Sequence, residues 1–113
     1  MQLKIEEKIT LSTPSELGTE TVTYDVATTN ILYDVKSLAA AEEWVLDLEN
    51  IKIFWLYTDK DIVVTIGTEA GDPPVLTEVD VAVSRSLTLY STIKSLKITC
   101  GDVAATVKIA AGK

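Results

Sequence analysis

The most informative absence in this 113-residue sequence is histidine, of which the chain has none. Catalysis by a Ser-His-Asp triad or a Cys-His pair is therefore excluded, as are metal sites built on imidazole. A single cysteine, Cys100, excludes an internal disulfide bond. Ten basic residues stand against seventeen acidic ones, and the resulting net charge of −7 argues against nucleic acid as a partner.

The sequence also lacks any apolar run near the roughly 20 residues that a membrane-spanning helix needs, so we expect no membrane partner. Its start, Met1 to Ile5, alternates polar and apolar residues and is not typical of a signal peptide. A length of 113 residues is typical of one domain. We therefore expect a single domain over residues 1–113, made in the cytoplasm of the cell that produces it.

What the chain has in excess is β-branched residues: valine, isoleucine and threonine supply 37 of 113 positions. Apolar residues alternate with polar ones in ten segments about ten residues apart, and this period of two indicates half-buried strands. The segments are Leu3–Leu11, Val22–Val26, Ile31–Val35, Trp44–Leu48, Ile51–Tyr57, Ile62–Ile66, Val79–Val83, Leu87–Leu89, Leu96–Cys100 and Val103–Ile109. The sequence predicts an all-β fold, a single antiparallel β-sandwich or jelly-roll-like domain of about 8–10 short strands.

The segments between these strands carry turn-forming residues. Thr13–Gly18 contains Pro and Gly, and Gly67–Pro74 is the longest expected loop. We expect tight hairpins at Thr58–Asp61 and at Cys100–Val103. Ser37–Trp44 is rich in helix formers but short, and we favour a loop there over a helix.

No residue pattern points to catalysis, to a cofactor or to a metal. Asp59 and Asp61 supply two carboxylates where a Ca²⁺ cage needs about six or more ligands, so we interpret them as turn residues. In each of the pairs Glu6-Glu7 and Glu42-Glu43 the two side chains point to opposite faces of a strand, and we interpret them as solvated charge. Cys100 follows Leu96 and Ile98 at every second position, so we expect it on the buried side of its strand. A free cysteine there behaves as a small hydrophobe.

The candidate residues for a partner interface are all apolar or basic. Leu3 and Ile5 lie in residues 1–12, a segment that we expect to form an N-terminal arm or an edge strand. The segment around Trp55 is apolar on both parities, so both of its faces should be covered. We expect Trp55 in the core. For Phe54 and Leu56, on the other parity, contact with a partner stands beside packing in the core as an alternative. Arg85, the one arginine, is a candidate to bind an interfacial carboxylate.

From about residue 35 to the C-terminus the layout resembles small bacteriophage virion proteins. The resemblance lies in a Ser-Leu-Ala-Ala segment before a Trp-Val-Leu-Asp-Leu strand, the strand Ile51–Tyr57 followed by Ile62–Ile66, and the closing pair Ile93–Thr99 and Ala104–Ile109. Proteins of this kind are typically capsid decoration (cement) proteins or small tail or neck components. The resemblance brings no catalytic motif and does not cover the N-terminal third.

The resemblance implies a non-enzymatic structural protein located in the virion, and we favour capsid decoration over a tail or neck role. The implied partners are the major capsid protein or other virion proteins, together with further copies of the chain as a dimer or trimer. A protein with an arm for strand pairing and an acidic, soluble surface suits that task. The alternative from another class is a β-sandwich module that binds carbohydrate or a receptor through exposed aromatic side chains.

Overall fold

The computed structural model of this chain describes residues 2–11, 18–46, 50–68 and 76–113; for residues 8–11, 18–20 and 91 it describes the backbone alone. Ten strands account for most of these residues, and all their pairings are antiparallel. They are β1 (Gln2–Leu11), β2 (Gly18–Ala27), β3 (Ile31–Leu38), β4 (Glu43–Leu46), β5 (Ile51–Thr58), β6 (Ile62–Gly67), β7 (Leu76–Val81), β8 (Arg85–Ile93), β9 (Ser95–Cys100) and β10 (Ala105–Gly112). The described residues contain no helix that is long and apolar enough to cross a membrane. The predicted all-β antiparallel fold is confirmed.

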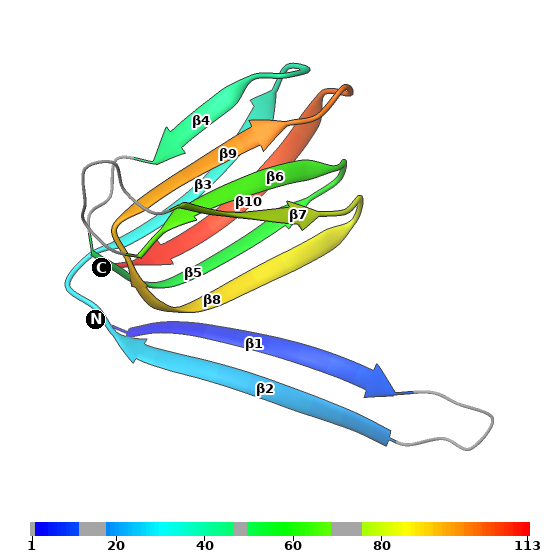
Figure 1. Cartoon of the computed structure of the whole chain (residues 1–113). Helices are drawn as coiled ribbons and strands as arrows, with labels where there is room; N and C mark the ends of the chain where they lie inside the picture. The colour runs from blue at the N-terminus through cyan, green and yellow to red at the C-terminus, as the bar shows by residue number, and fades with distance from the viewer. Residues whose placement is uncertain (1, 12–17, 47–49, 69–75) are drawn as a thin grey trace.

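Eight of the strands form two four-stranded sheets that face each other (Figure 1). One sheet has the order β3–β10–β5–β8 and the other the order β4–β9–β6–β7. Successive strands cross from one sheet to the other at every step except between β6 and β7, which are neighbours in one sheet. This arrangement of eight strands in two packed sheets is a jelly roll.

Two of the expected hairpins are corrected by this topology. The turn at Thr58–Asp61 leads from β5 to β6, and the turn at Cys100–Val103 leads from β9 to β10. In both cases the two strands belong to different sheets. The prediction was wrong because turn residues and alternation show where a strand ends and do not show which sheet the chain enters next. The preference for a loop over a helix after Ser37 is confirmed: β3 ends at Leu38 and β4 begins at Glu43.

The main core fills the space between the two sheets. Its fully buried members include Phe54 and Leu56 from β5, Val64 from β6 and Ile98 from β9. Burying a side chain of this size is worth about 1.5–3 kcal/mol relative to leaving it in water. Cys100 belongs to the same cluster and is 4% exposed, as its parity predicted.

The first two strands stand apart from the sandwich as a β-hairpin. They pair over ten positions, from Gln2↔Ala27 to Leu11↔Gly18, without a register shift. Within the described residues they form a separate two-stranded sheet. Figure 1 shows the hairpin running alongside β8 and extending past the end of that strand. The expected arm in residues 1–12 is therefore one half of a hairpin whose other half is β2.

Candidate interaction surfaces

The base of the hairpin is held by a small apolar cluster on the outside of the sandwich. Ile5 and Val26 from the hairpin pack on Ile53 of β5, and all three are buried. Leu3, Tyr24 and Trp55 pack around them and are half-buried. The side chains of Ile53 and Trp55 thus face away from the main core, and the hairpin covers them.

Further contacts fix the hairpin base against the sheet. The rings of Tyr24 and Tyr90 lie with their centroids 5.9 Å apart, and the hydroxyl of Thr88 donates a hydrogen bond to the Glu7 carboxylate. Gly112 is needed for close approach: a Cβ there would lie 2.6 Å from Cγ2 of Thr28 and 3.2 Å from Cδ2 of Leu3. The hairpin is consequently anchored near its open end, where the chain enters and leaves it.

The connection from the hairpin to β3 is tied to the C-terminus. The backbone N–H of Thr29 donates to the carbonyl of Lys113 at 2.7 Å, and the N–H of Lys113 donates to the carbonyl of Asn30 at 2.9 Å. This bridge holds the open end of the hairpin at the end of the sandwich where β10 finishes.

The outer surface of the β3–β10–β5–β8 sheet, here called the arm-side face, continues beyond the hairpin base. Two rows of paired residues cross it, Tyr33–Ala110–Trp55–Thr88 and Val35–Lys108–Tyr57–Ser86. Tyr33 is 65% exposed and Val35 is 46% exposed, although both are large and apolar. Aromatic side chains from two strands therefore share a surface with small and hydroxylated neighbours.

The strands of the arm-side face carry few charged side chains. The described outward positions of these strands carry the lysines Lys52 and Lys108 and no Asp or Glu. The chain as a whole has a net charge of −7. The hairpin that lies on this face adds carboxylates, and that of Glu7 accepts a hydrogen bond from the Thr88 hydroxyl. The face is therefore aromatic, and the two lysines of its strands are offset by carboxylates of the hairpin.

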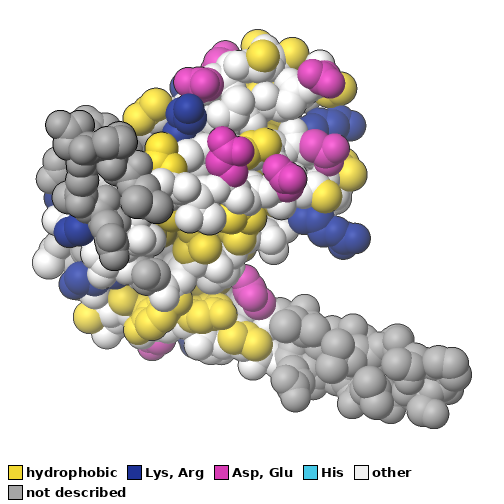
Figure 2. All heavy atoms as spheres, in the orientation of Figure 1, with side chains coloured by type: hydrophobic (Ala, Val, Ile, Leu, Met, Phe, Trp, Pro, Cys, Tyr) yellow, Lys and Arg dark blue, Asp and Glu magenta, His cyan; other side chains and the backbone are white. Residues whose placement is uncertain are grey.

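The outer surface of the β4–β9–β6–β7 sheet, here called the acidic face, carries more carboxylates than lysines. Its outward positions include Glu43, Glu78 and Asp80 together with one lysine, Lys97. Lys97 lies 3.5 Å from the Glu43 carboxylate, so Glu78 and Asp80 supply the net charge. Figure 2 shows carboxylates lying among hydrophobic side chains on the side of the molecule where this sheet faces the viewer.

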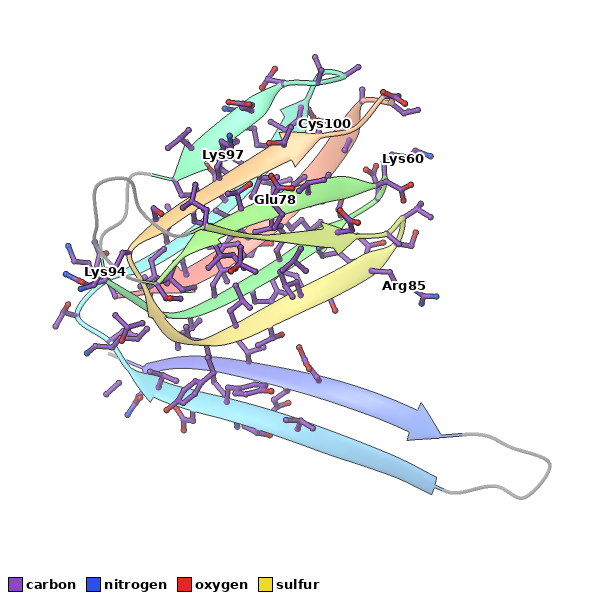
Figure 3. All side chains as sticks on the ribbon, viewed as in Figure 1. Lys60, Glu78, Arg85, Lys94, Lys97 and Cys100 are labelled. Carbon is purple, nitrogen blue, oxygen red and sulfur yellow. The ribbon has the colours of Figure 1, made fainter. Side chains whose placement is uncertain are left out.

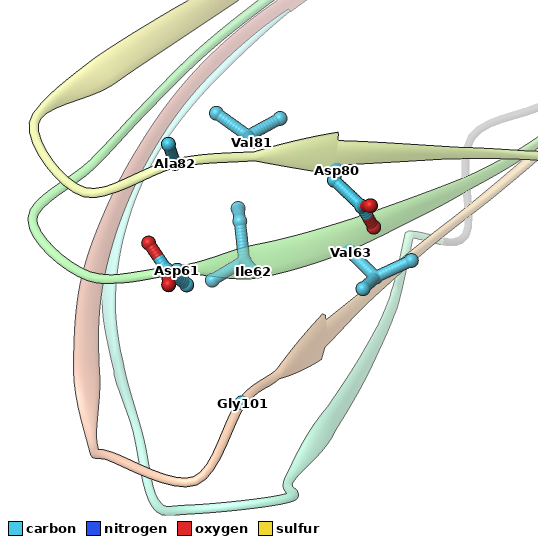
Figure 4. Close-up of a pocket in the computed structure, with 7 residues that line it drawn as sticks. All are labelled: Asp61, Ile62, Val63, Asp80, Val81, Ala82 and Gly101. Carbon is cyan, nitrogen blue, oxygen red and sulfur yellow. The ribbon is translucent and has the colours of Figure 1, made fainter.

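A hollow of about 360 Å³ lies beside the ends of β6 and β7 (Figure 4). Its lining includes Asp61 and Asp80, which invites comparison with the carboxylate pair of a glycosidase. The Asp61 carboxylate accepts a hydrogen bond of 2.7 Å from the backbone N–H of Val83. Figure 4 shows the two carboxylates on either side of Ile62, pointing away from each other. The arrangement is that of a turn capped by Asp61 and not of two carboxyls aimed at one bond.

Asp59 plays a matching structural part on the other side of the same turn. Its carboxylate accepts a hydrogen bond of 2.7 Å from the backbone N–H of Thr106 at the start of β10. Both aspartates were interpreted as turn residues, and both lie in the β5–β6 turn. Each carboxylate binds the backbone of a strand or turn that is distant in sequence. The described residues contain no group of three or more Cys, Asp or Glu placed to hold a metal ion.

The predicted interface residues lie in three different environments. Leu3 and Ile5 contact the chain's own β5 and so anchor the hairpin. Phe54 and Leu56 have no exposed surface and lie between the two sheets, where a partner cannot reach them. Arg85 is exposed at the start of β8, and Figure 3 shows it pointing away from the body at the end of the sandwich opposite Lys94.

The assignment of the two faces of β5 is therefore corrected. Trp55 was expected in the core, but it lies half-buried on the outer surface beside the hairpin. A register shift between Ile51 and Ile53 changes the parity within the strand, and both faces are apolar, so alternation alone could not decide between them. Tyr33 and Tyr57 share the arm-side face with Trp55, and the sequence did not place the three together. Each tyrosine is an aromatic residue at an outward position of its strand, which is the signal that could have placed it there.

Comparison with known proteins gives a likeness that concerns the fold. The solved structure of oxalate oxidase in complex with the substrate analogue glycolate is similar to this chain with a TM-score of 0.54. Sequence identity is 9%, and the likeness covers 74% of this chain and 42% of that one. The two share a jelly roll. No known protein family and no curated protein matches the sequence.

This likeness limits what can be carried over. The chain spans less than half the length of the oxalate oxidase chain. A jelly roll serves viral capsid proteins, lectins and cupins, so the fold does not choose a function. The function has to be argued from the hairpin and from the two outer faces.

Proposed function

We propose that this chain is a non-enzymatic structural protein of a bacteriophage particle, and that it acts as a capsid decoration (cement) protein bound to the major capsid protein. The observation that carries the proposal is the β1–β2 hairpin, which is anchored at its base and runs past the end of β8. Four residues of β1, 8–11, follow Glu7, the farthest residue along the strand with a described contact to the sandwich, and they span about 13 Å.

The energetics of the hairpin support a role in binding. A two-stranded hairpin is marginally stable in water unless another layer covers it. The described contacts with the sandwich involve Leu3, Ile5, Glu7, Tyr24 and Val26, near the open end of the hairpin. Both hairpin strands also have an open edge, since their sheet has two members within the described residues. A partner that adds a strand to such an edge satisfies its free N–H and C=O groups.

The bacteriophage assignment is carried by the resemblance of residues 35–113 to small virion proteins. That segment contains almost all of the jelly roll, while the hairpin lies outside it. By analogy, the jelly roll is an architecture used by viral capsid proteins. A tail or neck component is the alternative role within the same particle, and copy number separates the two.

Quantitative mass spectrometry of purified particles tests the proposal. A decoration protein should be present at a copy number comparable to that of the major capsid protein, and a neck or tail component at far fewer copies. Absence of the chain from purified particles would show that the proposal is wrong.

A binding assay tests the part assigned to the hairpin. Purified protein is added to particles that lack it, and bound protein is measured by co-sedimentation. We expect Val22→Asp, at a half-buried position on the hairpin, to weaken binding at least tenfold. Thr23→Asp, at the exposed neighbouring position, is the matched control and should bind as the wild type does. Equal binding by all three proteins would show that the hairpin is not the contact.

A further inference from the structure

We infer that an extended segment of the major capsid protein lies on the part of the arm-side face formed by β3 and β10, and that it pairs with the free edge of β1. The segment places an apolar side chain over Ala110 and an Asp or Glu side chain beside Lys108. The inference deepens the proposed function and rests on it, because it names the surface that binds the capsid and the chemistry of the bound segment.

The strand β1 lies on the β10 side of the hairpin. At the hairpin base, a Cβ on Gly112 of β10 would lie 3.2 Å from Cδ2 of Leu3 in β1. Val26 of β2 instead lines a groove together with Tyr90 and Thr92 of β8. The free edge of β1 therefore faces the surface of β10 and β3, whereas the free edge of β2 faces away from them.

Beyond its base the hairpin crosses toward β8. The hydroxyl of Thr88 in β8 donates a hydrogen bond to the Glu7 carboxylate of β1, and Figure 1 shows the hairpin continuing alongside β8. The surface of β3 is left open to solvent, since Tyr33 is 65% exposed and Val35 is 46% exposed. The free edge of β1 thus borders an exposed part of the sheet.

This exposed part has a small residue at its centre, with larger side chains on the strands to either side. Its six residues, here called the β10 strip, are Tyr33 and Val35 of β3, Ala110 and Lys108 of β10, and Trp55 and Tyr57 of β5. Ala110 is 9% exposed and lies between Tyr33 and Trp55. The strands β3 and β5 are two strand spacings apart, about 10 Å, so one extended segment can lie along β10 between their side chains.

An extended segment has the period that the β10 strip requires. Side chains on one face of a strand recur about every 6.7 Å, which is also the spacing of Ala110 and Lys108 along β10. An apolar side chain over Ala110 contacts Tyr33 and Trp55 and removes their apolar surface from water. A carboxylate two residues farther along meets Lys108, which forms no ion pair with the part of the chain that the structure describes.

Backbone pairing with β1 adds to these side-chain contacts. The edge N–H and C=O groups of β1 can bond to an incoming strand, because its sheet has two members among the residues described. Leu3 and Ile5 of β1 already belong to the cluster that includes Ile53 and Trp55. The capsid segment would be the third strand of the hairpin layer, and it would extend an interface that β1 already makes with the sheet.

Binding to particles that lack the protein tests the inference, with co-sedimentation as the measurement. Ala110→Trp places a bulky ring where the segment lies and should weaken binding about tenfold or more. Thr65→Trp is the matched control, since Thr65 is an outward residue in the middle of the acidic face. It should bind as the wild type does. Circular dichroism and thermal unfolding show whether each variant is folded.

The expected carboxylate has its own test. Lys108→Glu should weaken binding about tenfold or more, whereas Lys108→Arg keeps the charge and should bind as the wild type does. Lys60→Glu makes the same charge change in the β5–β6 turn, away from the β10 strip, and serves as the matched control (Figure 3).

Cross-linking identifies the bound segment directly. A carbodiimide joins an amine to a carboxylate in contact with it and adds no spacer. On decorated particles it should join Lys108 to an Asp or Glu of the major capsid protein, and the cross-linked peptide should carry an apolar residue two positions from that carboxylate.

Four outcomes would overturn the inference. If Ala110→Trp binds as the wild type does while Val22→Asp binds weakly, the hairpin acts without the β10 strip and the proposed function stands. A Lys108 cross-link to a second copy of this chain would identify that copy as the occupant. Release of the wild type from particles by neutral oligosaccharides would identify a glycan. Absence of the chain from purified particles would overturn the proposed function and the inference together.

Discussion

The sandwich and the hairpin are built from the same alternating β-branched sequence, yet they are stabilised in different ways. In the sandwich, each strand buries one face against the opposite sheet, and turns such as Thr58–Asp61 are hydrogen-bonded to neighbouring strands. In the hairpin, the buried apolar side chains gather at the base around Ile5, Val26 and Ile53. Alternation thus forms strands in both regions, but the second layer decides how firmly they are held.

This contrast implies two levels of stability in one chain. Removal of a side chain from the main core should unfold the whole sandwich, whereas removal of one from the hairpin base should release the hairpin first. The predictions below test that separation, beginning with the largest expected effect.

Phe54→Ala should cause the largest loss. Phe54 has no exposed surface and lies between the two sheets, so the substitution leaves a cavity and should lower the free energy of unfolding by about 3–5 kcal/mol. Chemical denaturation followed by far-UV circular dichroism measures the change. A loss near zero would mean that Phe54 is not in the core.

Ile5→Ala should lower stability by about 2 kcal/mol, and the effect should be local. Ile5 is 7% exposed and joins the hairpin to Ile53. Hydrogen exchange should show faster exchange at β1 and β2 amides, with β9 and β10 unchanged. Equal acceleration in all strands would show that the hairpin and the sandwich unfold as one unit.

Asp59→Ala should lower the free energy of unfolding by about 1–2 kcal/mol. The substitution leaves the Thr106 N–H without its carboxylate acceptor, and an unpaired donor near the core carries a desolvation cost. Thermal unfolding measures the effect. Asp61→Ala is the matched comparison and should cost less, because the Val83 N–H that it frees is exposed to water.

Lys4→Gln should leave the thermal midpoint unchanged at pH 7. Lys4 and Glu6 form an ion pair of 3.0 Å on the exposed side of β1, where solvent screens it. The Glu6 carboxylate raises the pKa of Lys4, first by accepting a hydrogen bond from its ammonium group and then through its negative charge. Any contribution to stability is therefore present below the usual lysine pKa and lost as the pH rises above it. Thermal scans between neutral and alkaline pH provide the check, and a clear loss at pH 7 would contradict the expectation.

Sequence reasoning succeeded where a signal is local. The ten expected segments correspond to ten strands, and the inward parity of Cys100 and the absence of a helix after Ser37 were correct. Alternation within one strand shows that the strand has an apolar side and a polar side. That property belongs to the strand itself and does not depend on which strand pairs with it. Local turn chemistry likewise marked the ends of β5 and β9.

Reasoning from sequence failed where the direction that a side chain faces depends on what packs against its strand. Phe54 and Trp55 are neighbours in an apolar strand, and either could have faced the core. The register shift at the start of β5 and the hairpin on its outer surface decide that Phe54 faces inward and Trp55 outward. The gathering of Tyr33, Trp55 and Tyr57 on one face was equally hidden, because it requires knowing that β10 separates β3 from β5.

The sequence by itself determined that this protein is an all-β chain without histidine chemistry, since composition and period-two alternation act within each segment. The tertiary structure alone decided that the turns cross between sheets, that the N-terminal strand pairs with β2 as a hairpin, and that aromatic residues of β3 and β5 share one outer face. The physical reason is that strand order and register arise from contacts between residues far apart in the chain. A pattern within one strand records that it has a buried side, but not what covers it.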